Sequence, residues 1–138
     1  MAALARSVAT LRLAGDDLEP EEVSRMLGAQ PTHAQRKGEV IVLKSGATKV
    51  AKSGQWRLEA TDAEPEAINE QISQLLAQLT QDLAAWQGLA RRFRIDLFCG
   101  WFMNESNEGV CLSAATLRAL GQRGIELDVD LYAPDTGA

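Results

Sequence analysis

A one-sided helical pattern between residues 66 and 93 constrains the fold of this chain most. Apolar residues recur there at steps of three and four, which places them on a single stripe of an α-helix. The stripe consists of Ile68, Ile72, Leu75, Leu76, Leu79, Leu83, Trp86, Leu89 and Phe93. A helix with one apolar face must pack against a partner, and strand-like segments lie on both sides of it in the sequence. We therefore expect one long amphipathic helix, beginning near Glu66, packed on a β-sheet.

Alternation of apolar and polar residues, or short runs of β-branched ones, predicts six strands around this helix. They cover residues 7–14, 39–44, 55–61, 94–102, 109–113 and 125–132. With short helices at 20–27 and after residue 113, the order is βαββαββαβ. We expect 39–44 to pair with 55–61 as one hairpin and 94–102 with 109–113 as another. The prediction is an α+β fold with a mixed, largely antiparallel sheet and ferredoxin-like elements.

The first short helix is well marked. Glu19 suits the N-cap position and Pro20 the first helical position, where the missing N–H costs nothing. Gly28 is a typical stop. The last short helix is expected to turn two leucines inward, Leu117 and Leu120.

Length and charge bound the class of protein. A chain of 138 residues with 46% hydrophobic content predicts a single α+β domain over residues 1–138, with an ordered core at about 7–132. Fourteen basic and nineteen acidic residues give a net charge of −5, which argues against nucleic acid as a partner. No segment approaches the roughly 20 apolar residues of a membrane span, and the first residues lack a signal-peptide pattern. We therefore expect no membrane partner and a cytoplasmic location.

The two cysteines, Cys99 and Cys111, are expected to be buried free thiols. Cys99 would share the inward face of its strand with Ile95, Leu97 and Trp101. In the expected partner strand, Cys111 would point to the other side. Because neighbouring strands with cysteines on opposite faces cannot bridge them, a disulfide is not expected.

No pattern for catalysis, cofactor binding or metal binding is found. The sequence lacks glycine-rich phosphate loops, paired Cys-x-x-Cys motifs and a nucleophile elbow. The only histidine, His33, has no carboxylate and nucleophile nearby in the sequence, so a catalytic role is not expected. Asp128 and Asp130 share one side of a strand, where they suit a polar sheet face or a protected edge. We predict no catalytic residues, no cofactor and no metal.

The segment from His33 to Arg57 carries the one anomalous charge distribution. Six of its residues are Lys or Arg and only Glu39 is acidic, so its net charge is +5 in a chain of −5. Such asymmetry favours a contact surface for an acidic protein or an anion, although solvated loop lysines would look the same. Trp56 is expected to be half-exposed beside this loop, whereas Trp86 and Trp101 suit the core. The candidate contact residues are His33, Arg36, Lys37, Lys49, Lys52, Trp56 and Arg57.

The run from Thr10 through Asp16-Asp17-Leu18-Glu19-Pro20-Glu21-Glu22-Val23 continues to Leu27-Gly28, Pro31-Thr32 and Lys37-Gly38. Together with Trp56 and the ending Leu127-Asp128-Val129-Asp130-Leu131-Tyr132, it resembles the bacterial domain of unknown function 4279 family. The resemblance covers residues 8–132. It implies a small, stand-alone α+β bacterial domain with no agreed activity and no established catalytic residues. No site residue is carried over from it.

Three functional hypotheses follow. The favoured one is a non-enzymatic protein-interaction or regulatory domain that uses the basic hairpin or an exposed sheet face. The second is a small-ligand-binding or enzymatic domain, with its pocket between the long helix and the sheet near Trp56, His33 and Arg36. The third is a structural homodimer formed through an exposed sheet edge or face.

Overall fold

A five-stranded sheet forms the centre of the computed structural model, which describes residues 2–135. Its strands, in spatial order, are β3 (His33–Gln35), β6 (Gly54–Glu59), β2 (Arg6–Gly15), β7 (Arg94–Phe102) and β9 (Glu126–Tyr132). Only β7 and β9 run parallel; the other neighbours are antiparallel. The predicted α+β class and mixed, mostly antiparallel sheet are therefore confirmed.

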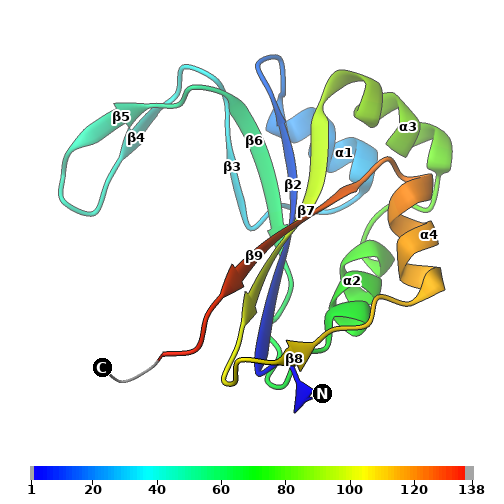
Figure 1. Ribbon diagram of the computed structural model, residues 1–138. Helices are drawn as coiled ribbons and strands as arrows, with labels where there is room; N and C mark the ends of the chain where they lie inside the picture. Colours follow the sequence, from blue (N-terminus) through cyan, green and yellow to red (C-terminus); the bar gives the residue numbers. More distant parts are fainter. Residues whose placement is uncertain (1, 136–138) are drawn as a thin grey trace.

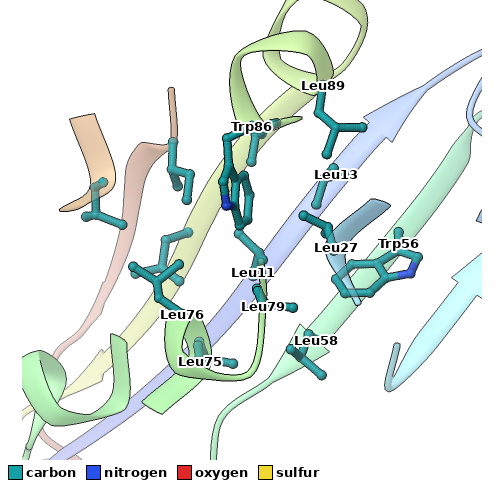
Figure 2. Packing of buried hydrophobic residues seen from close by; sticks show 14 of the residues in the cluster. Leu11, Leu13, Leu27, Trp56, Leu58, Leu75, Leu76, Leu79, Trp86 and Leu89 are labelled. Atoms are coloured by element: carbon teal, nitrogen blue, oxygen red, sulfur yellow. The ribbon is translucent and has the colours of Figure 1, made fainter. Parts of the chain in front are cut away.

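Four helices supply the second layer, α1 (Pro20–Leu27), α2 (Ile68–Ala77), α3 (Leu83–Arg92) and α4 (Ala114–Gln122) (Figure 1). Their buried residues pack with alternate side chains of β2, β6 and β7 in one core. Figure 2 shows Leu11 and Leu13 of β2 between Trp56 on one side and Trp86 on the other. The remaining side chains of the sheet form the opposite face, which we call the open sheet face.

The expected single long helix is wrong. The structure has two helices, α2 and α3, separated by residues 78–82. The Gln81 side-chain amide donates to the carbonyl oxygens of Leu76 and Leu79, at 3.0 and 2.8 Å, and so caps the end of α2. The Asp82 carboxylate then accepts from the backbone N–H of Ala84 and begins α3. A 28-residue helix would be about 42 Å long, and the break lets two shorter stripes cover the twisted sheet instead.

Both expected hairpins are also wrong. β4 (Val40–Val42) pairs with β5 (Thr48–Val50), in a segment expected to be a loop, whereas β6 lies between β3 and β2. β7 lies between β2 and β9, and the short β8 (Glu108–Gly109) pairs with β1 (Ala2–Ala3). Consequently the predicted order βαββαββαβ and the ferredoxin-like arrangement are not confirmed. Within residues 2–135 the strands number nine and the helices four.

The predicted helix boundaries agree with the structure better than the predicted strand pairings do. Pro20 begins α1, and Gly28 ends it with a φ of 78°, in the left-handed region that favours glycine. Glu19 occupies the N-cap position, but its side chain makes no cap hydrogen bond. On α4, Leu120 is buried as expected, whereas Leu117 is 52% exposed, which corrects its inward assignment.

Both cysteines are free, as expected. Cys99 is buried on the core face of β7, but Cys111 is exposed, which corrects its predicted burial. The prediction that the two cysteines lie on opposite faces of neighbouring strands is wrong in its detail, because Cys111 lies outside the named strands.

Candidate functional site

The seven predicted contact residues do not form one cluster. Two of them are already paired within the fold. Arg36 binds the carboxylates of Glu19, at 2.6 Å, and of Glu21, both at the start of α1. Lys37 lies 3.1 Å from the carboxylate of Asp16. These pairs join the segment after β3 to the N-terminus of α1, so both cations have an internal role.

Trp56 is fully buried, which corrects the expectation of a half-exposed contact. It lies on the core face of β6, and its indole N–H donates to the hydroxyl of Ser24 on α1 at 3.0 Å. The alternating side-chain direction of β6 explains the difference, because Trp56 and Leu58 face the helices while Gln55 and Arg57 face the other way. Trp56 is therefore a core anchor and offers no contact surface.

β4 and β5 form a two-stranded hairpin that projects from the body of the protein (Figure 1). We call residues 39–52 the hairpin arm. Its register places Val40, Val42 and Val50 on one side, where they are 63%, 70% and 61% exposed. Isolated exposed valines are ordinary, but three on one side of a projecting hairpin make an apolar surface.

The hairpin arm also carries three lysines. Lys44, Lys49 and Lys52 are exposed, and none of them forms an ion pair with another residue in the described part of the chain. Glu39 is the only acidic residue of the arm. Of the two predicted contact residues on the arm, Lys49 pairs with Ile41 on the side opposite the valines, and Lys52 follows β5. The apolar surface was not among the predicted features.

The remaining two predicted residues, His33 and Arg57, meet on the open sheet face. Directly opposed residues in neighbouring strands share a face. The registers align His33 with Arg57, Arg57 with Arg12, and Arg12 with Asp96 in one row across four strands. The next row aligns Gln35, Gln55, Ala14 and Arg94.

Arg12 is firmly held in this face. Its Nε and Nη2 atoms each donate to the Asp96 carboxylate at 2.7 Å, and its guanidinium lies 4.6 Å from the centre of the Phe98 ring. The carboxylate of Asp128 on β9 lies 3.4 Å from the same Nη2 atom. The hydrogen bond with Asp96 raises the pKa of Arg12 further above its ordinary value. Arg12 therefore remains a fixed cation at all physiological pH values.

A hollow of about 200 Å³ opens beside Arg12, above the small side chain of Ala14. Gln55, Arg57 and Arg94 line it, together with Leu13, Arg12 and Asp96. Ala14 lies between Gln55 and Arg94 in its row, and its short side chain leaves the space open. Arg57 and Arg94 form no ion pair or side-chain hydrogen bond with another residue among 2–135.

The expected pocket between the helices and the sheet is filled by side chains. Trp56, Trp86 and the leucines around them occupy that space (Figure 2). His33 lies on the opposite face from Trp56, and Arg36 is bound to α1. The second functional hypothesis is therefore wrong in its location, and the hollow lies on the other side of the sheet.

Arg12 and Arg94 were missed as candidate residues. Arg12 was visible as a polar position in an alternating strand, and Arg94 begins another such strand. Alternation indicates which residues share a face within one strand, but only the register shows which residues of different strands are neighbours.

The described residues offer neither a metal-binding cluster nor a membrane-spanning helix. In the described range, no three or more His, Cys, Asp or Glu side chains are grouped so as to hold a metal ion. Across the same residues, none of the helices has the length and apolar character needed to cross a bilayer.

Comparison with known proteins identifies a family but no activity. The family described as "Domain of unknown function (DUF4279)" matches residues 5–134, nearly the whole chain. Among curated proteins, and likewise among solved structures, no significant match was found. The match confirms the resemblance drawn from the Asp-Leu-x-Pro-x-Glu-Val stretch. This chain therefore belongs to the domain of unknown function 4279 family.

Proposed function

We propose that this protein is a non-enzymatic interaction domain that docks an acidic segment of a partner protein through its hairpin arm. The observation that supports this most is the exposure of Val40, Val42 and Val50 on one side of a projecting hairpin. We further propose that it acts in the bacterial cytoplasm. Two free cysteines suit that reducing compartment.

The apolar surface of the arm explains why a partner would bind there. Burying three valine side chains removes apolar area from water, which favours association. Protein interfaces commonly combine such an apolar centre with a polar rim. Ile41 and Lys49, which pair with each other, point to the other side of the same hairpin.

Charge explains why the partner would be acidic. Three lysines against Glu39 give the arm a net charge of +2, which leaves −7 for the rest of a chain whose total is −5. An acidic segment is attracted to the arm and repelled by most of the remaining surface. Such complementarity selects the partner and its orientation more than it adds affinity.

Affinity purification of the tagged protein from its own cells, followed by binding of the purified partner, tests the proposal. We expect K49E/K52E to weaken binding by about two- to thirtyfold at low salt, from roughly 0.2–1 kcal/mol for each exposed charge pair. The salt dependence of the affinity should flatten. Val42→Asp, which places a charge in the apolar centre, should weaken binding at least about tenfold.

R91E/R118E is the matched control. Arg91 and Arg118 are exposed on α3 and α4, away from the arm, and their reversal changes the net charge equally. Binding should be nearly unaffected in this variant. Equal weakening by the two double variants, or full binding by V42D, would contradict the proposal. Recovery of the protein without a partner would contradict it as well.

A homodimer through the free edge of β9 is less well supported. This edge carries exposed Leu131, but also Glu126, Asp128 and Asp130. Two antiparallel copies of β9 would bring these carboxylates together, and such edge charges oppose strand pairing. The mass of the protein in solution checks this directly, and a monomer is the expected result.

A further inference from the structure

The hollow above Ala14 on the open sheet face supports a second inference, which does not depend on the hairpin arm. Three arginines reach it from three adjacent strands, Arg57 from β6, Arg12 from β2 and Arg94 from β7. They are far apart in the sequence and are brought together only by the register of the sheet.

The charge of this hollow is not balanced by its own lining. Of the described residues, Asp96 is the only acidic one that lines it, and both of its oxygens accept hydrogen bonds from Arg12. Three arginines against one aspartate leave a net charge of +2. Arg57 and Arg94 supply this excess, because neither has a carboxylate partner among the described residues.

The Arg57 side chain is also incompletely satisfied. Its Nε atom is shielded from solvent and has no hydrogen-bond partner among residues 2–135. A buried donor without a partner is unfavourable. A nearby anion would lower that cost, since the guanidinium charge is shared by all of its nitrogens.

Acidic residues limit the site on one side. Glu126 lies opposite Asp96, and Asp128 lies opposite Phe98, both on β9. Arg12 stands between these carboxylates and Arg57, and it is neutralised by Asp96 and Asp128. An anion is therefore expected on the Arg57 and Arg94 side of Arg12, above Ala14, and not over β9.

We propose that this hollow binds the phosphate group of a small molecule. Guanidinium forks match the geometry of phosphate oxygens, and a dianion balances the +2 charge. Pockets for drug-sized ligands have volumes of about 300–1,000 Å³. A hollow of about 200 Å³ accepts the phosphate group alone, so the rest of the ligand extends into solvent.

The first test is titration of the full-length protein with inorganic phosphate at constant ionic strength, followed by backbone amide NMR. We expect saturable binding with one site, and the largest shifts at residues 12–14, 55–57 and 94–96. Sulfate should bind comparably, and acetate clearly more weakly because it carries one charge. Absence of saturation, or shifts centred on the hairpin arm, would overturn the proposal. Acetate binding as tightly as phosphate would overturn the assignment to phosphate.

Variants separate this site from general surface charge. R57Q and R94Q should each weaken phosphate binding at least about tenfold, as expected for the loss of a charged hydrogen-bond donor. R57K should weaken phosphate binding less, because lysine keeps the positive charge but lacks the two parallel N–H donors of the guanidinium. Arg91→Gln removes an exposed arginine of α3 and should leave the affinity unchanged. Equal effects of R57Q and R91Q would overturn the proposal.

Ala14→Leu tests the hollow itself without changing any charge. The larger side chain should fill the space above Ala14 and abolish binding, while an unchanged circular dichroism spectrum shows that the sheet is intact. Unchanged phosphate affinity in a folded A14L protein would overturn the proposal. K49E/K52E should leave this binding nearly unchanged, so failure of the phosphate site and failure of the hairpin proposal are distinguishable.

Discussion

Arg36 and Arg57 show how the same residue type takes different roles in one basic segment. Arg36 binds two carboxylates at the start of α1, and the hydrogen bond that it donates to Glu19 is the main reason that its pKa is raised. Arg57 has no such partner among residues 2–135 and faces the hollow above Ala14. In the sequence, both residues look like free cations. Only the tertiary contacts show that Arg36 is held in internal ion pairs, whereas Arg57 forms none with the described residues.

The two cysteines should differ sharply in reactivity. Burial, together with the charge of Asp96, raises the pKa of the Cys99 thiol to about 12, so little thiolate forms at pH 8. Cys111 is exposed. Titration of the native protein with Ellman's reagent should detect one thiol, and titration in denaturant should detect two. The C111S variant should give almost no native reaction; rapid reaction of that variant would contradict the prediction.

At the scale of elements, the break between α2 and α3 is the main departure from the sequence pattern. The apolar steps continue across residues 78–82, so periodicity alone gives no sign of the break. The local signal was Asp82, a good N-cap residue, preceded by Thr80. The backbone N–H of Thr80 bonds to the Leu27 carbonyl at 2.8 Å, and its carbonyl accepts from the Trp86 indole at 2.9 Å. The bond to Leu27 holds the break against α1, and the bond from Trp86 joins it to α3.

Replacement of Asp82 by alanine tests this break. The variant loses the cap of α3, and we expect the free energy of unfolding to fall by about 1 kcal/mol. Urea denaturation followed by tryptophan fluorescence measures it. Gln87→Ala, on the exposed side of α3, is the control and should change stability by less than about 0.5 kcal/mol. A more stable D82A protein would indicate that one continuous helix forms after all.

At the scale of the whole molecule, ion pairs join α1 to its neighbours. Glu22 of α1 accepts from Arg92 of α3 at 2.7 Å, and Glu21 accepts from Arg36 beyond β3. The hydrogen bond from Arg92 lowers the pKa of Glu22. The pKa of Glu21 is lowered first by its backbone hydrogen bond and then by Arg36. These carboxylates therefore favour the folded state most when they are ionised.

Stability should decrease in acid for this reason. A carboxyl whose pKa is lower in the folded state stabilises the protein above its unfolded value, here 4.5. That contribution is lost as the pH falls from about 4.5 through the lowered pKa. The difference in Tm between wild type and Glu22→Gln should therefore be largest near pH 7 and shrink below pH 4.5. An equal difference at pH 3 and pH 7 would contradict the assignment.

Most individual elements were predictable, because they depend on neighbouring residues. The starts and ends of α1, the inward faces of β2 and β7, and the apolar stripe of α2 and α3 all follow from local spacing. The candidate site was less predictable. Lys49 and Lys52 were proposed from charge alone. Val40 and Val42 looked like part of an ordinary internal strand, and Val50 lay outside every predicted strand.

The sequence by itself determined the fold class, the family and the alternation that separates core residues from surface residues. These properties follow from side-chain period, from turn residues and from a motif, which are all local in the chain. The tertiary structure alone decided which strands pair. It therefore decided that β4 and β5 project as an arm, that Trp56 is buried, and that Arg12, Arg57 and Arg94 meet. Pairing depends on long-range packing, and a period of two residues does not specify a strand's neighbour.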